Sequence, residues 1–438
     1  MTSETSTTTP AATAQASQDL LTRRYATLGS HSPLFYDKPL ELVSGTGVWL
    51  TDSDGKTYLD GYNNVPHVGH ANPMVADAIN AQLRQINLHT RYLNSRVVEY
   101  AEALLATFSG ELQRLFLTNS GSEANELALR IARQHTGNTG VLVSDFSYHG
   151  NTTSLAELTT GLKVREPFGQ HVRALRIPDA TETDDHERLL REALMDVDAA
   201  IASLQESGHG VSAFLYDPLF STEGLVQVPD GYIEGVSTRV RAAGGLVIAD
   251  EVQSGFGRIG SLMWGHQMYS TTPDLVTLGK PMGNGHPVGG VVTSADLLDE
   301  FGRHNMYFNT FAGNPVSSAA GMAVLHFMQQ EDLMAQADSL GGYIAGRLAT
   351  VAAGSPHVGS VRGRGLYFGL DIVEAEGSGP APQLTKALIE SMRERGVLIS
   401  RIGRDDNVLK MRPPLVFTRQ NADILLEQLT ESLAALKA

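Results

Sequence analysis

Short apolar runs alternate with amphipathic stretches through the middle of the chain, between about residues 113 and 293. The apolar runs have strand length and end at turn residues, whereas the stretches between them repeat apolar positions at helical spacing. This alternation predicts an α/β unit with a mainly parallel sheet between helices. The predicted strands are Arg114–Thr118, Val141–Ser144, Val172–Ile177, Ala213–Tyr216, Leu246–Ala249, Leu275–Leu278 and Gly289–Thr293, and the predicted helices include Glu123–Gln134, Asp185–Gln205 and Tyr232–Ala242.

The flanking sequence predicts a smaller α+β domain built from both ends of the chain. Its first 18 residues are mostly Thr, Ser and Ala, which predicts a disordered tail and lacks the apolar run of a secretory signal. The predicted elements outside the central unit are strands Leu40–Leu50, Lys56–Tyr62, Val361–Ile372 and Val408–Met411, helices that start at Asn72-Pro73, two long helices after Asn314-Pro315, and a final helix Arg419–Leu436. We therefore expect a tail over 1–18, an N-terminal segment of the small domain over 19–70, a large domain over 71–325 and the C-terminal small domain over 326–438.

Composition excludes several classes of function. The 438 residues include 33 Lys and Arg against 48 Asp and Glu, so the formal net charge is 33 − 48 = −15. Nucleic acids and anionic membranes both need clustered cations, and we expect neither as a partner. The absence of cysteine removes thiol nucleophiles, disulfides and iron–sulfur clusters. No apolar stretch reaches the ~18 residues of a membrane span, and we expect a cytoplasmic protein.

Two charged residues follow buried strands at the edge where open α/β sheets bind ligands. Asp250 ends the apolar run 246–249, and a carboxylate there can pair with a protonated ring nitrogen. Lys280 follows the strand Leu275–Leu278 within a Gly-rich turn, where partial burial lowers the pKa of an amine, as a Schiff-base lysine requires. The structural alternatives are a strand-end Asp that caps a turn and an ordinary surface lysine.

A phosphate-binding turn is predicted between the strand 114–118 and the helix that follows it. Ser120, Gly121 and Ser122 stand at the helix N-terminus, where free backbone N–H groups attract anions. Ser120 also has the spacing of a capping box with Glu123, and a cap and an anion can share the turn. Further on, Tyr148 follows another strand and could cover one face of a planar ring, although such a residue often belongs to the core.

Two other patterns are weaker. Residues 255–260 match GxGxxG, but no periodic helix follows them and no acid stands about 20 residues further on, so we interpret them as a Gly-rich loop and give a nicotinamide oxidoreductase little weight. His67 and His70 have ligand-like spacing without an evident third ligand. Hydrogen-bonded histidines explain them better than a metal site, and we expect no metal.

Taken in chain order, a phosphate cradle, a ring cover, a strand-end Asp and a later Lys fit a pyridoxal phosphate site. Here the chain resembles the class III aminotransferases, which are fold-type I pyridoxal-phosphate enzymes, over roughly residues 35–436. The motifs that carry the resemblance are NSGSEANE (119–126), YHG (148–150), ADEVQSGFGR (249–258), LGKP (278–281) and NTFAGNP (309–315).

The resemblance implies a pyridoxal 5'-phosphate cofactor and a homodimer with its sites at the subunit interface. It assigns the Schiff base to Lys280 and the contact with the ring nitrogen to Asp250. Tyr148 and Val252 would cover the two faces of the ring, and Gln253 would contact the ring hydroxyl. Ser120, Gly121 and Ser122, with Thr310 of the partner subunit, would bind the phosphate, and His149 would make a further cofactor contact.

A finer resemblance concerns the reaction. The segments NNVPHVGH (63–70), KPMGNGHPVGG (280–290), MYFNTFAGNPVS (306–317) and VLKMRPPLVFT (408–418) are similar to the subgroup of ethanolamine-phosphate phospho-lyases. We therefore expect elimination of phosphate from a small phosphorylated amine such as O-phosphoethanolamine, giving acetaldehyde and ammonia. The alternative is an aminotransferase that uses an amine or omega-amino acid and a 2-oxo acid. The candidate residues for the substrate's distal group are Asn64, Arg91 and Arg401, of which Arg401 could bind a phosphate or a carboxylate. Residues 217–224 depart from the wider family, and no roles are carried over there.

Overall fold

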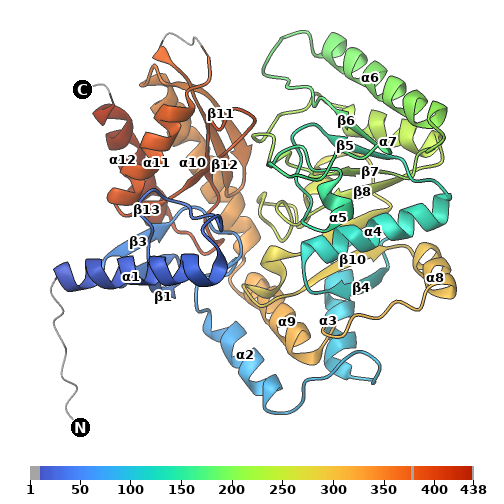
Figure 1. The fold of residues 1–438 in the computed structure, drawn as a ribbon, viewed down its shortest axis with the longest axis horizontal. Helices are drawn as coiled ribbons and strands as arrows, with labels where there is room; N and C mark the ends of the chain where they lie inside the picture. The colour runs from blue at the N-terminus through green and yellow to red at the C-terminus, as the bar shows by residue number, and fades with distance from the viewer. Residues whose placement is uncertain (1–9, 376–378, 437–438) are drawn as a thin grey trace.

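A computed structural model describes residues 10–375 and 379–436, and a seven-stranded sheet forms the centre of its larger unit (Figure 1). The strands follow the order β4-β10-β9-β8-β7-β5-β6, and β10 runs antiparallel to both of its neighbours while all other neighbours are parallel. All seven predicted strands are present, as β4 (Arg114–Thr118), β5 (Val141–Ser144), β6 (Val172–Leu175), β7 (Ala213–Tyr216), β8 (Leu246–Asp250), β9 (Leu275–Leu278) and β10 (Gly289–Thr293). The predicted mainly parallel sheet is confirmed.

Helices cover both faces of this sheet because its strands are apolar on both sides. In β7, Ala213 and Leu215 pack toward α4 and α8, whereas Phe214 and Tyr216 pack toward α6 and α7. The alternation follows from the two-residue period of a strand. The helices of this unit are α4 (Gly121–Thr136), α5 (Thr153–Ala156), α6 (His186–Glu206), α7 (Tyr232–Ala242) and α8 (Ala295–His304), with 3-10 turns η1 (Gly265–Met268) and η2 (Lys280–Gly283).

The smaller unit combines strands from both ends of the chain in two four-stranded sheets, ordered β1-β2-β3-β13 and β11-β12-β15-β14. The pairing of β3 with β13 is parallel and joins residues that lie more than 300 positions apart, such as Leu59 and Val397. These strands are β1 (Leu42–Thr46), β2 (Trp49–Asp52), β3 (Thr57–Asp60), β11 (Val358–Arg364), β12 (Tyr367–Ile372), β13 (Val397–Leu398), β14 (Ser400–Ile402) and β15 (Val408–Met411).

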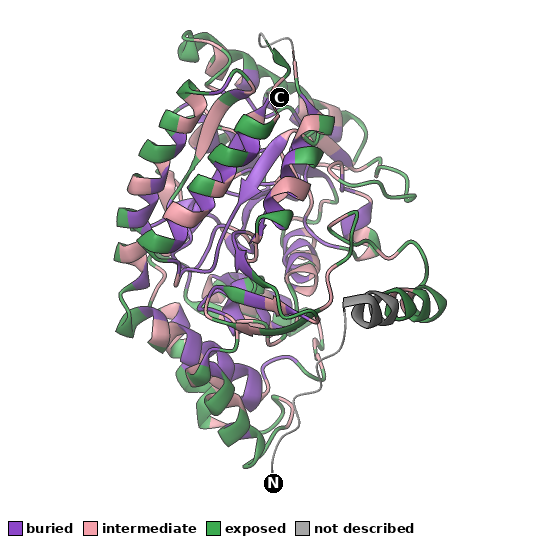
Figure 2. Cartoon of the chain, turned by 90° about the vertical axis from the view of Figure 1, so that its left-hand side faces the viewer, coloured by how far each residue is buried: buried purple, intermediate pink, exposed green. Residues whose placement is uncertain are grey.

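Three of the remaining helices, α9, α10 and α12, join the small sheets to the large one. Buried side chains of α9, α10 and α12 share one apolar core with Val276 and Leu278 of β9, so the two units have a continuous interior (Figure 2). In Figure 2 the purple, buried residues gather at the centre and the outer helices carry the exposed ones. These helices are α1 (Pro10–Leu28), α2 (Pro73–Leu83), α3 (Ser95–Leu105), α9 (Pro315–Gln330), α10 (Leu333–Ala353), α11 (Pro382–Glu394) and α12 (Arg419–Ala435).

Two predictions about the flanking segments need correction. The predicted disordered tail extended to residue 18, but helix α1 begins at Pro10 and residues 1–9 lie outside the described residues. The sequence 10–18 is rich in Ala, a strong helix former, and Pro is well suited to the first helical position. The single predicted strand Leu40–Leu50 is divided into β1 and β2 by a turn at Gly47, whose φ of 60° suits glycine.

The topology brings five chain segments to one edge of the large sheet. The strands β5, β7, β8 and β9 are parallel, and β4 points the same way because β10 is antiparallel to both β4 and β9. Their carboxyl ends therefore meet, and the loops that follow them bear most of the predicted site residues. In the part of the chain that the structure describes, no helix combines the length and the apolar character needed to cross a membrane.

Candidate active site

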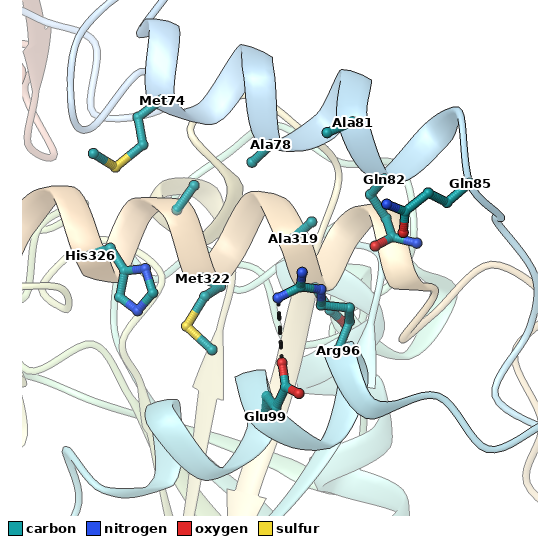
Figure 3. A pocket seen from close by; sticks show the side chains of 12 residues that line it. Met74, Ala78, Ala81, Gln82, Gln85, Arg96, Glu99, Ala319, Met322 and His326 are labelled. Carbon is teal, nitrogen blue, oxygen red and sulfur yellow. Dashed lines mark hydrogen bonds and ion pairs between the residues drawn. The ribbon is translucent and has the colours of Figure 1, made fainter.

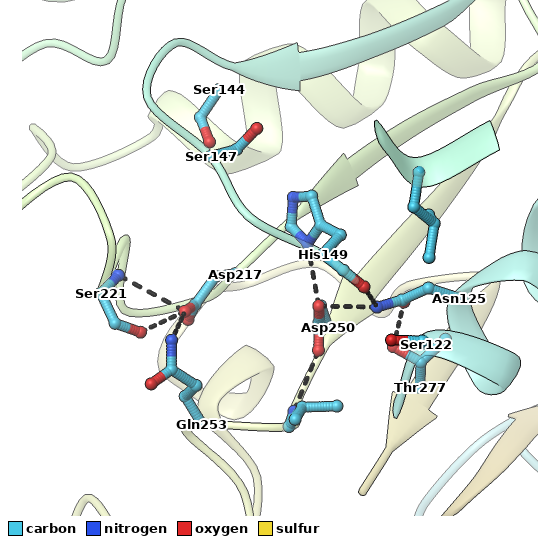
Figure 4. Close-up of polar contacts among 12 residues, drawn as sticks. Ser122, Asn125, Ser144, Ser147, His149, Asp217, Ser221, Asp250, Gln253 and Thr277 are labelled. Atoms are coloured by element: carbon cyan, nitrogen blue, oxygen red, sulfur yellow. Dashed lines mark hydrogen bonds and ion pairs between the residues drawn. The ribbon is translucent and has the colours of Figure 1, made fainter. Parts of the chain in front are cut away.

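Asp250 stands at the carboxyl end of β8, where it is buried and accepts hydrogen bonds from three groups (Figure 4). Its Oδ2 accepts from Nδ1 of His149 at 2.8 Å and from Nδ2 of Asn125 at 2.8 Å, while its Oδ1 accepts from the backbone N–H of Val252 at 3.1 Å. These three donors fix the orientation of the carboxyl group, and the simple turn cap considered from the sequence does not describe Asp250.

The N-terminus of α4 lies beside β8, the strand that ends at Asp250, and it has the features of an anion-binding site. Ser120 is the N-cap, with its Oγ accepting from the N–H of Glu123 at 3.2 Å, so the cap predicted from the sequence is present. The reciprocal carboxylate contact goes to the N–H of Asn119 at 2.7 Å. The first N–H groups of a 16-residue helix have no partner within the helix and attract negative charge.

Glycine is required at positions 121 and 279, where the start of α4, the loop after β8 and the turn before Lys280 lie against one another. A Cβ atom at Gly121 would lie 2.8 Å from Cγ2 of Val252, and one at Gly279 would lie 3.0 Å from the backbone nitrogen of Gly121. These contacts place Val252 and the residue before Lys280 directly against the start of α4. Three motifs that are far apart in the sequence thus form one surface.

Lys280 opens the turn η2 with a φ of 26°, a strained conformation for a residue with a side chain. Its side chain retains exposed surface, yet the protein atoms around its amine disfavour the charged form. Together with the positive charge of Arg412 they lower the pKa of Lys280 to about 8, against the opposing effects of Asp250 and Asp217. The amine is therefore a better base and nucleophile than an ordinary lysine.

Two further cations, Lys410 and Arg412, face the site and were missed in the sequence analysis. They alternate along the end of β15, so they point to the same side, while Leu409 and Met411 point into the core. The Nζ of Lys410 lies 3.4 Å from Oε1 of Gln253, and Arg412 donates to the same oxygen. Burial and the charge of Arg412 depress the pKa of Lys410 well below its usual value.

Aromatic rings flank this cation pair. The centroid of Tyr367 is 5.4 Å from Nζ of Lys410 and 5.3 Å from Cζ of Arg412, and Tyr62 lies at similar distances from both. Among the described residues, neither cation forms an ion pair with a carboxylate. A buried amine and a buried guanidinium, held by π-faces and one amide oxygen, form a site suited to an anion, whose negative charge would favour the protonated form of Lys410.

Arg401, by contrast, does not face this surface. It pairs with Leu409 across β14 and β15, so its side chain lies on the face opposite Lys410, and it contacts Asp406 at 3.5 Å. Strand register therefore directs Arg401 away from the Lys410 and Arg412 pair, and its predicted contact with the substrate's distal group stays a prediction. A Lys-x-Arg pattern at the end of an apolar strand was the signal for the two cations that do face the site.

Two acids lie in the segment that departs from the wider family, the buried Asp217 near Lys410 and the half-buried Glu223 beyond it. Asp217 follows β7 and accepts from the hydroxyl of Ser221, and burial raises its pKa. Glu223 accepts from the hydroxyl of Ser144, and burial together with Asp217 raises the pKa of Glu223 to about 8. Gln253 donates to Asp217 at 3.5 Å and so links these acids to Arg412.

The other predicted residues occupy two places. Asn64 is buried, and neither of its amide atoms has a partner among the described residues. Arg91 and Thr310 are exposed, and the guanidinium of Arg91 lies 3.8 Å from the ring centroid of Phe308. A single chain therefore does not bring Arg91 or Thr310 to Lys280. The predicted contacts of Tyr148, which is half-buried, and of Gln253 with a cofactor ring stay predictions.

The GxGxxG sequence forms a loop, as expected, and no α-helix follows it directly. His67, which is buried, accepts from Arg258 at 3.1 Å through Nδ1, so its Nε2 carries the hydrogen that it donates to the backbone oxygen of Phe256 at 2.6 Å. His70 bonds to Asp60 at 2.6 Å. Across the described parts of the chain, no three histidine or acidic residues form a group that could hold a metal ion.

A separate groove lies among α2, α3 and α9 (Figure 3). Methionine and alanine side chains form much of its lining, and its charged residues Arg96 and Glu99 are paired with each other at 3.5 Å. None of the predicted site residues lines it. The groove therefore does not take part in the chemistry at Lys280.

The residues around Lys280 fit pyridoxal phosphate on their own chemistry. The start of α4 offers N–H groups to a phosphate, Asp250 offers an oriented carboxylate to a ring nitrogen, and Lys280 offers an amine of lowered pKa. The glycines at 121 and 279 leave no room for a larger residue. The chain therefore has the parts that the sequence analysis expected of such a site.

Comparisons with known proteins agree with this geometry. The family described as Aminotransferase class-III matches residues 35–433. A Caenorhabditis elegans protein named ethanolamine-phosphate phospho-lyase homolog 1 is 36% identical over 96% of this chain and 95% of its own, and a Drosophila melanogaster alanine–glyoxylate aminotransferase 2-like protein is 38% identical over 93% and 85%. The solved structure of an Arthrobacter phospholyase in complex with phosphoethanolamine is 76% identical, with a TM-score of 0.94 over 95% of this chain and 100% of that one. The chain belongs to the class III aminotransferase family.

Proposed function

We propose that the protein is a pyridoxal-phosphate-dependent phospho-lyase that converts O-phosphoethanolamine and water into acetaldehyde, ammonia and phosphate. The similar Arthrobacter structure and the C. elegans relative carry the name of this activity. The observation in the chain itself that carries the proposal is the buried pair Lys410 and Arg412, which has no carboxylate partner in the described structure. The pair lies near Lys280, since Arg412 lowers the pKa of Lys280 and Lys280 lowers that of Lys410.

Pyridoxal 5'-phosphate supplies an electron sink that stabilises negative charge on the carbon next to the substrate nitrogen. Asp250 keeps the ring nitrogen protonated, and the α4 N-terminus with Ser120, Gly121 and Ser122 binds the phosphate. Lys280 would hold the cofactor through its amine until the substrate's amine takes its place, and the freed Lys280 amine would then remove the proton from the substrate carbon. A pKa of about 8 leaves a useful fraction of that amine uncharged near neutral pH.

The leaving group decides between elimination and transamination. A phosphoryl group on the β-carbon departs as phosphate if its growing negative charge is stabilised. Lys410 and Arg412 provide that stabilisation, since Arg412 can form two parallel hydrogen bonds to phosphoryl oxygens. A carboxylate would also be attracted to these cations, which is why an aminotransferase with a 2-oxo acid acceptor is the competing function.

Asn64 is the uncharged residue of the proposed phosphoryl-binding subsite, which it forms together with Lys410 and Arg412. A buried amide without partners is unfavourable by roughly 1–3 kcal/mol for each unmet group, and a bound phosphoryl oxygen would meet part of that need. Asn64 follows Tyr62 in a loop whose backbone accepts from the N–H of Arg412 at Gly61, over 2.7 Å. The loop that carries Asn64 is thus tied to the cation pair.

The homodimer accounts for the exposed positions of Arg91 and Thr310. Large apolar side chains surround them on the surface: Leu93 is fully exposed, as are most of Met306 and Phe311. Exposed apolar patches of this kind are typical of subunit interfaces. In a dimer this face covers the partner's site, so that Thr310 reaches the partner's cofactor phosphate and Arg91 the partner's substrate. The proposed location is cytoplasmic, which cell fractionation tests.

The experiment is to incubate purified holoenzyme with O-phosphoethanolamine and no 2-oxo acid, and to measure phosphate, acetaldehyde and ammonia. The proposal predicts equal amounts of all three. The Lys280→Ala variant is the control and releases none. Alanine formation from pyruvate and an amine, without phosphate release from phosphoethanolamine, would establish the aminotransferase instead.

A further inference from the structure

We infer that Asn125 and Thr277 are positioning residues that hold the Asp250 carboxylate in one orientation toward the cofactor ring. The inference rests on the cofactor assignment made above and is independent of which substrate is cleaved. Figure 4 shows the three side chains in contact, with Asn125 reaching from α4 to the two strands β8 and β9. None of the motif roles assigned above includes Asn125 or Thr277.

The two strands place Thr277 beside Asp250. Thr277 is the direct partner of Asp250 in the parallel pairing of β9 with β8, so both side chains point to the same face of the sheet. Asn125 covers that face from one turn inside α4. It accepts from Oγ1 of Thr277 at 2.6 Å through its Oδ1, and it donates through Nδ2 to Oδ2 of Asp250 at 2.8 Å.

The hydrogen bonds allow only one orientation of the Asn125 amide. Its NH₂ group has two hydrogens, and the second is donated to the backbone oxygen of His149 at 2.7 Å. If the amide were reversed, its oxygen would face two acceptors, the carboxylate of Asp250 and the carbonyl of His149. The hydroxyl of Thr277 strengthens this preference, because it donates to Oδ1 of Asn125.

These hydrogen bonds determine which oxygen of Asp250 can still accept from another donor. The side chains of Thr277, Asn125 and Asp250 are all buried, so water does not replace a lost bond there. Oδ2 of Asp250 receives two donors, from Asn125 and from Nδ1 of His149, and is saturated. Oδ1 accepts only the N–H of Val252 and can take one more donor, which a protonated ring nitrogen provides.

The test variant is Thr277→Val in the holoenzyme, because valine has the shape of threonine without the hydroxyl. Without that donor, Oδ1 of Asn125 loses its hydrogen bond and the amide is held less firmly against Asp250, so a bound ring nitrogen should lose its proton more easily. We expect kcat to fall by roughly 10- to 100-fold, as for other residues that orient a site, with KM little changed. We also expect the absorbance spectrum of the bound cofactor, and its pH titration, to shift.

Two matched variants separate positioning from packing. Thr277→Ser keeps the hydroxyl and should restore the spectrum and kcat of the unmodified enzyme. Thr293→Val removes an equally buried hydroxyl, which donates to the backbone oxygen of Asp274 at 2.8 Å on the neighbouring strand pair, and should leave the spectrum unchanged. A cofactor analogue with carbon in place of the ring nitrogen should abolish the kcat difference between Thr277→Val and the unmodified protein.

The inference is overturned if Thr277→Val has the spectrum, pH titration and kcat of the unmodified holoenzyme. It is also overturned if Thr277→Val and Thr277→Ser lose activity equally, or if thermal stability falls without a spectral change. Since the spectrum is recorded without substrate, a failure of the proposed lyase activity would not change this readout, and the two proposals fail independently.

Discussion

Arg412 gives the most informative single substitution, because its charge acts on both the substrate and Lys280. It is almost completely buried and has no carboxylate partner in the described structure, so its bonds are free to be redirected to an anion. A charge-assisted hydrogen bond contributes roughly 1.5–3 kcal/mol. At 1.36 kcal/mol for each factor of ten, Arg412→Gln should raise the KM for O-phosphoethanolamine roughly 10- to 150-fold.

The same substitution should change the pH dependence of kcat. The positive charge of Arg412 lowers the pKa of Lys280, so removing it favours protonated Lys280 and raises that pKa above about 8. Because the uncharged amine is the base, the rise of kcat with pH should move to higher pH. Arg412→Lys keeps the charge, so it should keep the pH profile while losing the paired hydrogen bonds and part of the affinity.

Arg401→Gln is the matched control, since Arg401 lies one strand away on the opposite face and contacts Asp406. Its KM and pH profile should stay within about twofold of the unmodified values, as for most surface substitutions. The assay is phosphate release from O-phosphoethanolamine, measured from pH 6 to pH 10 with all three variants. Equal KM values for Arg412→Gln and Arg401→Gln would refute the anion site at the end of β15.

Three shorter predictions test other parts of the site. Gly121→Ala should destabilise the protein by roughly 1–3 kcal/mol in a denaturant titration and weaken cofactor retention, because its Cβ would meet Val252 at 2.8 Å; an unchanged midpoint would show that the contact relaxes freely. Asn64→Leu should raise the melting temperature of the substrate-free enzyme and raise KM together, since it removes a buried amide without partners; a KM equal to that of the unmodified enzyme would exclude Asn64 from the subsite. Leu93→Asp should produce monomers in sedimentation and lose activity that depends on the partner's Thr310; a dimer at all concentrations would place the interface elsewhere.

Most of the large domain could be predicted because its strands are buried on both faces and appear as continuous apolar runs. The limits of β4, β5, β7, β9 and β10 agree with the sequence-based ranges. The small domain was harder, since β3 pairs with β13 from the far end of the chain and no local pattern signals that pairing. The split of Leu40–Leu50 was missed because a single glycine makes the turn.

The site could be predicted where a functional residue follows directly after a strand, as Asp250 and Lys280 do. Where the choice depends on strand register, the sequence did not single out Lys410 and Arg412, because only the pairing of β14 with β15 shows which side chains share a face. Asn125 was missed for another reason. It lies inside a helix, where a polar residue ordinarily faces solvent, and only the tertiary contact with Asp250 reveals it.

The most direct test of the phospho-lyase function is the number of phosphate ions released per Lys280 site when the holoenzyme is mixed with excess O-phosphoethanolamine and no 2-oxo acid. Elimination regenerates the resting enzyme after each cycle, so the account predicts release that continues for many turnovers at a constant rate. Transamination without an acceptor would stop after one conversion of the cofactor and release no phosphate. That result would contradict the account.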